Sequence, residues 1–292
     1  MKLSLLEYFK LTGKPLLLDG ANGSLIEQLG GKIDKYLWSS LSNLTNPDIV
    51  CDVHKNYIKS GANIITTNTF RTNPAAYNKS GLNIIDYENF VKISVNLAKK
   101  SVLNNNVFIA GSNSPAEDCY KKERDLNSHQ LEYNHKKHIE LLWNNGVDFI
   151  LNETQSHFDE ISIICKFCHS AKIPYVISLY FNENLTILSG ETLKEIIDYI
   201  MVYAPIAISF NCISSKIFKK VKPQLYADLL NGFYFNCGED NSSNKIKCIV
   251  TEETYTKIAK KFINKNTMFL GACCGSNYKH IIKLRELIDE SY

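Results

Sequence analysis

Short, almost continuously hydrophobic segments recur along the chain, separated by amphipathic ones. Eight of them are rich in β-branched and aromatic residues: 15–20, 63–67, 107–112, 147–153, 175–181, 206–212, 232–237 and 267–274. Unbroken apolar character, in contrast to strict alternation, is typical of parallel strands that are buried on both faces. The pattern therefore predicts eight parallel β-strands.

The intervening segments carry apolar residues at helical spacing. Residues 48–61 place Ile49, Val53 and Tyr57 on one face and end at Gly61, an expected C-cap. The same pattern covers residues 87–100, 130–145, 158–172 and 191–203. Strands that alternate with helices, without a linker rich in Pro, Gly or Ser, predict one (β/α)8 barrel domain over residues 1–292. The alternative is an open doubly wound sheet, but its glycine-rich dinucleotide-binding fingerprint is absent after the first strand.

Polar and cysteine residues gather where the predicted strands end. Catalytic groups of (β/α)8 barrels lie at the carboxyl-terminal ends of the strands. The residues at these ends are Asp19, Thr67, Asn68, Ser112, Asn152, Glu153, Asn211, Cys212, Asn236, Cys273 and Cys274. We therefore expect one polar site at that end of the barrel.

Composition and charge narrow the class of protein. The chain is 45% hydrophobic and 22% charged, as in ordinary globular proteins. Its net charge of +3, without a basic block, gives no electrostatic case for nucleic-acid binding. No segment approaches the roughly 18 apolar residues of a membrane span, and the apolar patch before Glu7 is too short for a signal peptide. Nine cysteines without a secretion signal predict free thiols or metal ligands in the cytoplasm.

Three cysteines at two strand ends could form a metal site. Cys212 ends the sixth predicted strand, and Cys273 and Cys274 end the eighth. The flanking Gly271 and Gly275 allow adjacent thiols to turn toward one point. Three thiolates leave one tetrahedral position open, the pattern of a catalytic zinc ion. The competing interpretation is that these cysteines are small buried core residues.

Other chemically active residues have simpler interpretations. Cys165 and Cys168, followed by His169, lie on the apolar face of a predicted helix, which favours a packing role. Cys51, also on a predicted helix, is interpreted as a packing residue too. Cys119 and Cys248 have no evident partner. The carboxylates of Asp19 and Glu153 could form an acid–base pair, bind a cation or ammonium group, or cap helices. Histidines without metal-ligand spacing are interpreted as helix or loop residues: His54, His129, His135, His138 and His157.

Seven motifs in order resemble the homocysteine S-methyltransferase family over nearly the whole chain. The first is Asp19-Gly20 with Gly23-Ser24, similar to that family's D-G-x-x-G-[ST] opening. The others are Leu37–Ser40 with Val53-His54, Thr67–Phe70, Gly111-Ser112, Asn152–Thr154, Asn211-Cys212 and Gly271–Gly275. Residues 234–239, Tyr-Phe-Asn-Cys-Gly-Glu, also resemble the family's Y-P-N-x-G-E stretch.

The resemblance implies a zinc enzyme that transfers a methyl group to the sulfur of homocysteine and forms methionine. Zinc would make the bound thiol a thiolate nucleophile, so no catalytic histidine is needed. The implied site residues are the zinc ligands Cys212, Cys273 and Cys274, the ammonium-binding Asp19 and Glu153, backbone amides near Gly20 and Thr67 for the carboxylate, and Asn236 in the fourth zinc position before substrate arrives.

The chain departs from the family at Ala272, Ser209 and Phe235, and most of all across residues 111–130, where donor recognition is expected. The sequence ends at Tyr292, directly after the helix expected to follow the eighth strand, so we expect no folate or cobalamin domain. No dinucleotide loop offers an adenosine site. We therefore expect a small sulfonium donor, S-methylmethionine first and S-adenosylmethionine second, with betaine as a rival. An aromatic wall of Trp38, Phe70 and Tyr180 is the expected donor site.

Two alternatives to this function stay open at the level of sequence. One is methyl transfer to another small thiol or a selenol. The other is a non-catalytic barrel that binds zinc or an amino acid, which the divergent 111–130 segment would favour.

Overall fold

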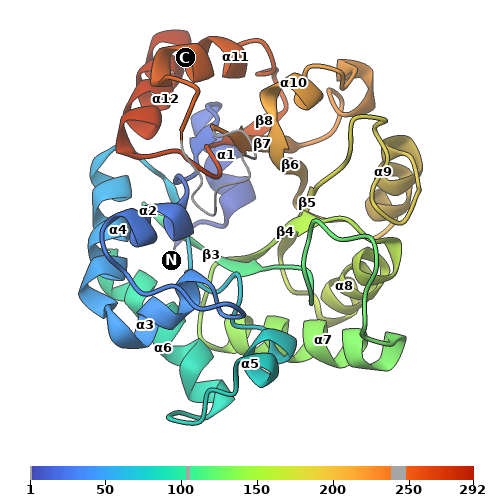
Figure 1. Ribbon diagram of the computed structural model, residues 1–292. Helices are drawn as coiled ribbons and strands as arrows, with labels where there is room; N and C mark the ends of the chain where they lie inside the picture. Colours follow the sequence, from blue (N-terminus) through green and yellow to red (C-terminus); the bar gives the residue numbers. More distant parts are fainter. Residues whose placement is uncertain (1, 103–105, 238–247) are drawn as a thin grey trace.

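Parallel strands surround a central axis, and helices form a ring outside them (Figure 1). The structure is a computed structural model that describes residues 2–102, 106–237 and 248–292. The strands in these ranges are β1 (Leu16–Leu17), β2 (Ile64–Thr66), β3 (Phe108–Asn113), β4 (Phe149–Gln155), β5 (Tyr175–Leu179), β6 (Ala207–Ser214), β7 (Asn231–Asn236) and β8 (Thr267–Leu270). They pair in the order β1-β8-β7-β6-β5-β4-β3-β2, and a parallel bridge from Leu18 to Ile64 joins the two ends. The predicted (β/α)8 barrel is confirmed.

The helices agree with the amphipathic pattern where that pattern is long. Those at predicted positions are α4 (Pro47–Lys59), α6 (Tyr87–Ser101), α7 (Ser128–Asn144), α8 (Phe158–Ala171), α9 (Leu193–Met201) and α12 (Tyr278–Ser291). Shorter helices, which the pattern did not reveal, are α1 (Leu5–Thr12), α2 (Asn22–Gln28), α3 (Ser42–Thr45), α5 (Pro74–Ser80), α10 (Ser215–Phe218) and α11 (Glu252–Ala259). Among the described residues, every helix is too short or too polar to cross a membrane.

Two apolar layers hold the barrel together. One lies between the sheet and the ring of helices. The other fills the barrel interior with alternate strand residues such as Leu16, Phe108 and Val176. Helix α1 packs Leu5 and Phe9 against this interior layer and lies behind the strands in Figure 1. The amino-terminal end of the barrel is thereby closed, and the opposite end is left for a site.

Strand β8 ends earlier than its apolar run predicted. The prediction extended to Cys274, whereas pairing stops at Leu270. Gly271 still donates a hydrogen bond from its amide to the Phe233 carbonyl oxygen. The chain beyond it is buried at the barrel mouth, so its apolar composition reflects burial in a loop and not a strand. This loop carries Cys273 and Cys274.

Candidate functional site

A cavity of about 600 Å³ opens at the carboxyl-terminal ends of the strands. Its deep wall includes residues from several strand ends that the sequence analysis selected: Asp19, Gly20, Thr67, Asn68, Ser112, Glu153, Cys212, Cys273 and Cys274. The expected polar site is therefore a single cavity, built from segments that are far apart in the sequence.

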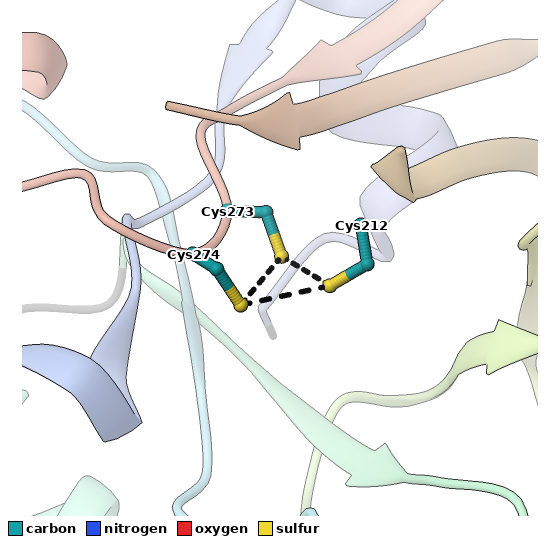
Figure 2. A group of neighbouring side chains, drawn as sticks. All are labelled: Cys212, Cys273 and Cys274. Atoms are coloured by element: carbon teal, nitrogen blue, oxygen red, sulfur yellow. Dashed lines mark hydrogen bonds between the residues drawn. The ribbon is translucent and has the colours of Figure 1, made fainter. Parts of the chain in front are cut away.

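The three predicted cysteines converge in this cavity, as Figure 2 shows. The Sγ atom of Cys274 lies 3.9 Å from those of Cys212 and Cys273, and the latter two sulfurs are 2.6 Å apart. Backbone hydrogen bonds hold the loop, since the Cys273 amide donates to the Phe235 carbonyl at 3.0 Å. The Cys237 amide donates to the Cys274 carbonyl at 2.9 Å.

Two of the three sulfur separations fit a tetrahedral metal ion bound by thiolates. Zn–S bonds of about 2.3 Å at tetrahedral angles hold neighbouring sulfurs about 3.8 Å apart. The two separations of 3.9 Å agree with that value, and the Cys212 and Cys273 thiols would move apart around an ion. Contact with the Cys212 and Cys274 thiols, together with burial, raises the pKa of the Cys273 thiol well above its usual value. A cation is therefore needed to hold all three as thiolates.

Cys212 reaches the cavity through an unusual backbone conformation. It has a φ of +54°, and the pairing of β6 with β7 shifts register between Asn211 and Ser214. Strand β4 has the same feature beside Glu153, because Thr154 has a φ of +57° and the β4–β5 register shifts between Asn152 and Gln155. Such irregularities redirect a side chain at a strand end. Both residues thereby face one cavity.

One asparagine links these two irregularities. The Oδ1 atom of Asn211 accepts hydrogen bonds from the Thr154 amide at 2.8 Å and the Ser178 hydroxyl at 2.7 Å. Its Nδ2 atom donates to Thr154 Oγ1 at 2.9 Å. The side chain of Asn211 is fully buried, so these bonds fix β4 and β6 relative to each other at the site.

Asn236 lies beside the cysteines. Its Nδ2 atom donates to the Cys212 carbonyl oxygen at 3.1 Å. Its Oδ1 atom is buried and has no hydrogen-bond partner among the described residues. A buried oxygen in that state fits the expected fourth zinc position, because an ion would satisfy it. Gly238 and Glu239, which complete the motif, lie outside the described residues.

Asp19 is buried at the end of β1. Its carboxylate accepts hydrogen bonds from the Thr66 amide at 2.8 Å and from the Asn22 side chain at 3.0 Å. Burial raises its pKa to about 8, against the lowering effect of these bonds, and the charge of Glu153 adds to the rise.

Glu153 lies at the end of β4 and accepts hydrogen bonds from the Ser112 hydroxyl and, at 3.2 Å, from the Tyr234 hydroxyl. Burial raises its pKa to about 7. The buried carboxyl group of Asp19 and the half-buried one of Glu153, both with raised pKa values, share one cavity. They are suited to a ligand that carries a positive charge.

The residues expected near the substrate carboxylate are both on the cavity wall. Gly20 is packed so tightly that a Cβ atom would lie 2.7 Å from the Tyr57 hydroxyl. The Thr67 amide, however, donates to the Ala110 carbonyl oxygen at 2.9 Å. A substrate would have to compete with that bond for the Thr67 amide.

The outer half of the cavity is formed by Trp38, Phe70 and the segment after β3. The rings of Trp38 and Phe70 meet edge to face with centroids 6.0 Å apart. Tyr120 lines the cavity. The Tyr180 ring packs edge-on against the Tyr120 ring, with centroids 5.2 Å apart. Sequence reasoning selected Tyr180 and missed Tyr120, which lies within the divergent 111–130 segment and carried no motif. Cys119 also lines this wall.

A buried polar network supports that segment. Glu160 on α8 accepts hydrogen bonds from the Ala116 amide at 2.8 Å and from Arg124 at 3.0 Å, and it contacts His135 Nε2 at 2.6 Å. His138 contacts Asn113 Oδ1 at 2.8 Å and Thr72 Oγ1 at 2.9 Å. These histidines are helix residues, as predicted, and their function is to anchor the ends of β3 and the following segment.

Four of the other cysteines form two groups. Cys165 and Cys168 are buried between α8 and the sheet, which agrees with the predicted packing. Cys248, for which no partner was evident, lies 3.5 Å from His280 Nε2 and near Cys237. Sequence analysis did not identify this second group, because its members come from three separate segments.

Comparisons with known proteins relate the chain to one family and one fold. The sequence model of the homocysteine S-methyltransferase family matches residues 16–288. Homocysteine S-methyltransferase 2 of Arabidopsis thaliana is 21% identical over 93% of this chain and 92% of its own length. Selenocysteine Se-methyltransferase of Brassica oleracea var. italica is 22% identical over 99% and 95%. The metallated form of the homocysteine methyltransferase MmuM from Escherichia coli has the same fold, with a TM-score of 0.82 at 21% identity over 97% of this chain and 99% of that one.

The Glu160 network yields a stability prediction. Burial opposes ionisation of Glu160, but its bonds to His135, Ala116 and Arg124 prevail and lower its pKa to about 2. Because this folded-state value lies below the ordinary one of 4.5, the stabilisation is complete above about pH 4.5 and is lost as pH falls toward 2. Glu160→Gln should therefore lower the free energy of unfolding by roughly 1–3 kcal/mol at pH 7, and the difference from wild type should shrink in acid.

Denaturant unfolding at several pH values measures this difference. The matched control is Asp159→Asn, which removes the half-exposed partner of the same Arg124 and should cost less than about 1 kcal/mol. Equal effects of the two substitutions would contradict a structural role for the buried carboxylate.

Proposed function

Because the chain belongs to the homocysteine S-methyltransferase family, we propose that it transfers a methyl group from a small sulfonium donor to the sulfur of homocysteine, with zinc held by Cys212, Cys273 and Cys274. The observation that carries the proposal is that three convergent thiols and the carboxyl groups of Asp19 and Glu153 share one cavity. The methyl carbon leaves the sulfonium sulfur, which keeps the electron pair of the broken bond, and joins the homocysteine sulfur.

The zinc site is supported by the fit of the donor set. When bound there, Zn²⁺ supplies the charge that keeps a coordinated substrate thiol deprotonated near neutral pH. The Asn236 carboxamide oxygen, buried and without a partner among the described residues, is our candidate for the fourth ligand in the absence of substrate. Methyl transfer to a thiolate needs alignment of donor and acceptor and no protein base.

The carboxyl groups of Asp19 and Glu153 orient homocysteine in our proposal. A substrate ammonium group between them would favour the ionised carboxylates and reverse the rise in pKa that burial causes. Ser112 and Tyr234 hold the Glu153 carboxylate by donated hydrogen bonds. These contacts would fix the substrate sulfur over the thiol cluster.

The outer part of the cavity suits a methyl donor that carries both positive and negative groups. Trp38, Phe70 and Tyr120 supply aromatic surface for an onium cation, an attraction of about 0.5–2 kcal/mol. The Arg71 guanidinium lies 5.4 Å from the Phe70 ring centre and also lines the cavity, where it would pair with a donor carboxylate. S-methylmethionine has a sulfonium, an ammonium and a carboxylate group, so it is our first choice, with S-adenosylmethionine second.

Loss of one thiol should remove metal and activity together. We expect Cys274→Ser to lose the zinc of this site and turnover, because a hydroxyl is a poor zinc ligand beside two thiolates. Zinc analysis of the purified protein and a methionine assay measure both quantities. The control is Cys165→Ser, a buried cysteine outside the site, which should keep both. Full zinc occupancy and turnover in Cys274→Ser would refute the metal assignment.

Neutralising Glu153 should separate substrate binding from metal binding. Glu153→Gln should retain zinc but bind homocysteine roughly 10- to 150-fold more weakly, since a charged hydrogen bond contributes about 1.5–3 kcal/mol. Calorimetric titration with homocysteine measures the affinity. Glu132→Gln, on the exposed part of α7, is the control and should bind like wild type. Unchanged affinity in Glu153→Gln would mean that other groups hold the ammonium.

A donor screen tests the function as a whole. With homocysteine as acceptor, methionine should form fastest from S-methylmethionine and more slowly from S-adenosylmethionine. Methionine formed from betaine or methyltetrahydrofolate, and none from S-methylmethionine, would overturn the donor assignment. Selenocysteine belongs in the same screen as an acceptor, because one relative, which matches 99% of this chain, is named for that activity.

A further inference from the structure

A second group of metal-binding side chains lies on the other side of β7. Tyr234 and Cys212 face the cavity, whereas Cys237, Cys248 and His280 meet outside it. The two Sγ atoms and an imidazole nitrogen lie within 4.8 Å of one another. Cys237 and His280 are buried, and Cys248 is exposed. The proposed function uses none of them.

Backbone and ring contacts bring the three side chains together. The amides of Ile249 and Val250 both donate to the Cys237 carbonyl oxygen at 3.0 Å, which holds the segment with Cys248 against the end of β7. The His280 ring packs edge-on against Tyr255, with centroids 5.8 Å apart. Little rearrangement would therefore be needed to bring all three to one ion.

The hydrogen bonds of His280 suit a metal ligand. Its Nε2 atom donates to the Val250 carbonyl oxygen at 3.0 Å, so Nε2 carries the proton in the metal-free protein. Its Nδ1 atom accepts a hydrogen bond from the Asn277 amide at 3.3 Å and lies 3.2 Å from Asn277 Oδ1. In the other tautomer Nδ1–H donates to this oxygen, in exchange for the bond from the Asn277 amide, and the Nε2 lone pair is free. A free Nε2 lone pair is the usual arrangement of a metal-bound histidine.

We propose that Cys237, Cys248 and His280 bind a second Zn²⁺ ion, separate from the one in the cavity. Two thiolates and a neutral imidazole balance the charge of Zn²⁺, as a half-buried site requires, and soft sulfur with nitrogen selects zinc over Mg²⁺ or Ca²⁺. The Val250 carbonyl oxygen lies 3.1 Å from Cys248 Sγ and 3.0 Å from His280 Nε2, so an oxygen is at hand for the fourth position. Binding releases the two thiol protons to solvent.

The first test is the zinc content of the purified full-length protein, isolated without chelator. Wild type should contain two zinc ions per chain and Cys248→Ser one. Because Cys248 is exposed, this substitution carries little risk of unfolding the protein. Cys51→Ser, a cysteine on α4 outside both groups, is the control and should keep two. Equal zinc content in wild type and Cys248→Ser would overturn the proposal.

A second measurement makes the test independent of the catalytic assignment. Cys212→Ser/Cys273→Ser/Cys274→Ser, checked for folding by circular dichroism, is titrated with Co²⁺. It should still develop the thiolate-to-cobalt absorption, and adding Cys248→Ser should abolish that absorption. If the triple variant fails to fold, the zinc contents of wild type and Cys248→Ser decide alone. A disulfide between Cys237 and Cys248 in the freshly isolated protein, seen as a linked peptide by mass spectrometry, would also overturn the proposal.

Discussion

The hydrogen bonds between Asn211 and Thr154 are the constraint on which the site depends. They join two left-handed backbone positions, one at Thr154 and one at Cys212, on strands that are not neighbours in the sheet. A non-glycine residue in that conformation costs about 1–3 kcal/mol. The buried asparagine offsets part of that cost, because it satisfies the Thr154 amide that the register shift removes from the ladder. It therefore helps to hold Glu153 and Cys212 in position beyond the regular pairing of their strands.

The two halves of the cavity are held by different means. The strand ends hold the three cysteine thiols and the carboxyl groups of Asp19 and Glu153. The half of the cavity proposed to bind homocysteine is therefore as rigid as the barrel itself. The donor side is built from the segment after β3, which has little regular structure and depends on the buried Glu160 network. Loops on a rigid scaffold vary more readily than the scaffold. This division explains how residues 111–130 diverge from the family pattern while the cysteines and carboxylates at the strand ends match it.

The sequence predicted the strands and strand ends of this structure well and the loops poorly. Continuous apolar runs identified each strand, and the polar residues that end them identified Glu153, Cys212 and Cys274, because barrel topology brings strand ends together. The register shifts could not be predicted, since they depend on cross-strand bonds from Asn211 to Thr154. Tyr120 and the group of Cys237, Cys248 and His280 were missed for a related reason. Only Cys237 follows a strand directly, and no periodicity reveals contacts between separate segments. Short helices such as α2 lacked enough turns to show a pattern.

Strand β7 connects the cavity to the outer surface of the barrel. Its alternation directs Tyr234 inward and Phe235 outward, and the end of the strand continues this with Asn236 beside Cys212 and Cys237 beside His280. The Cys237 amide donates to the Cys274 carbonyl, so the peptide between the two groups is bonded to the loop that carries the cavity thiols. An ion held by Cys237 would restrict this peptide and, through it, the position of Cys274. Because a displacement of about 1 Å in a catalytic group can cost a hundredfold in rate, a site outside the cavity can still influence the chemistry within it.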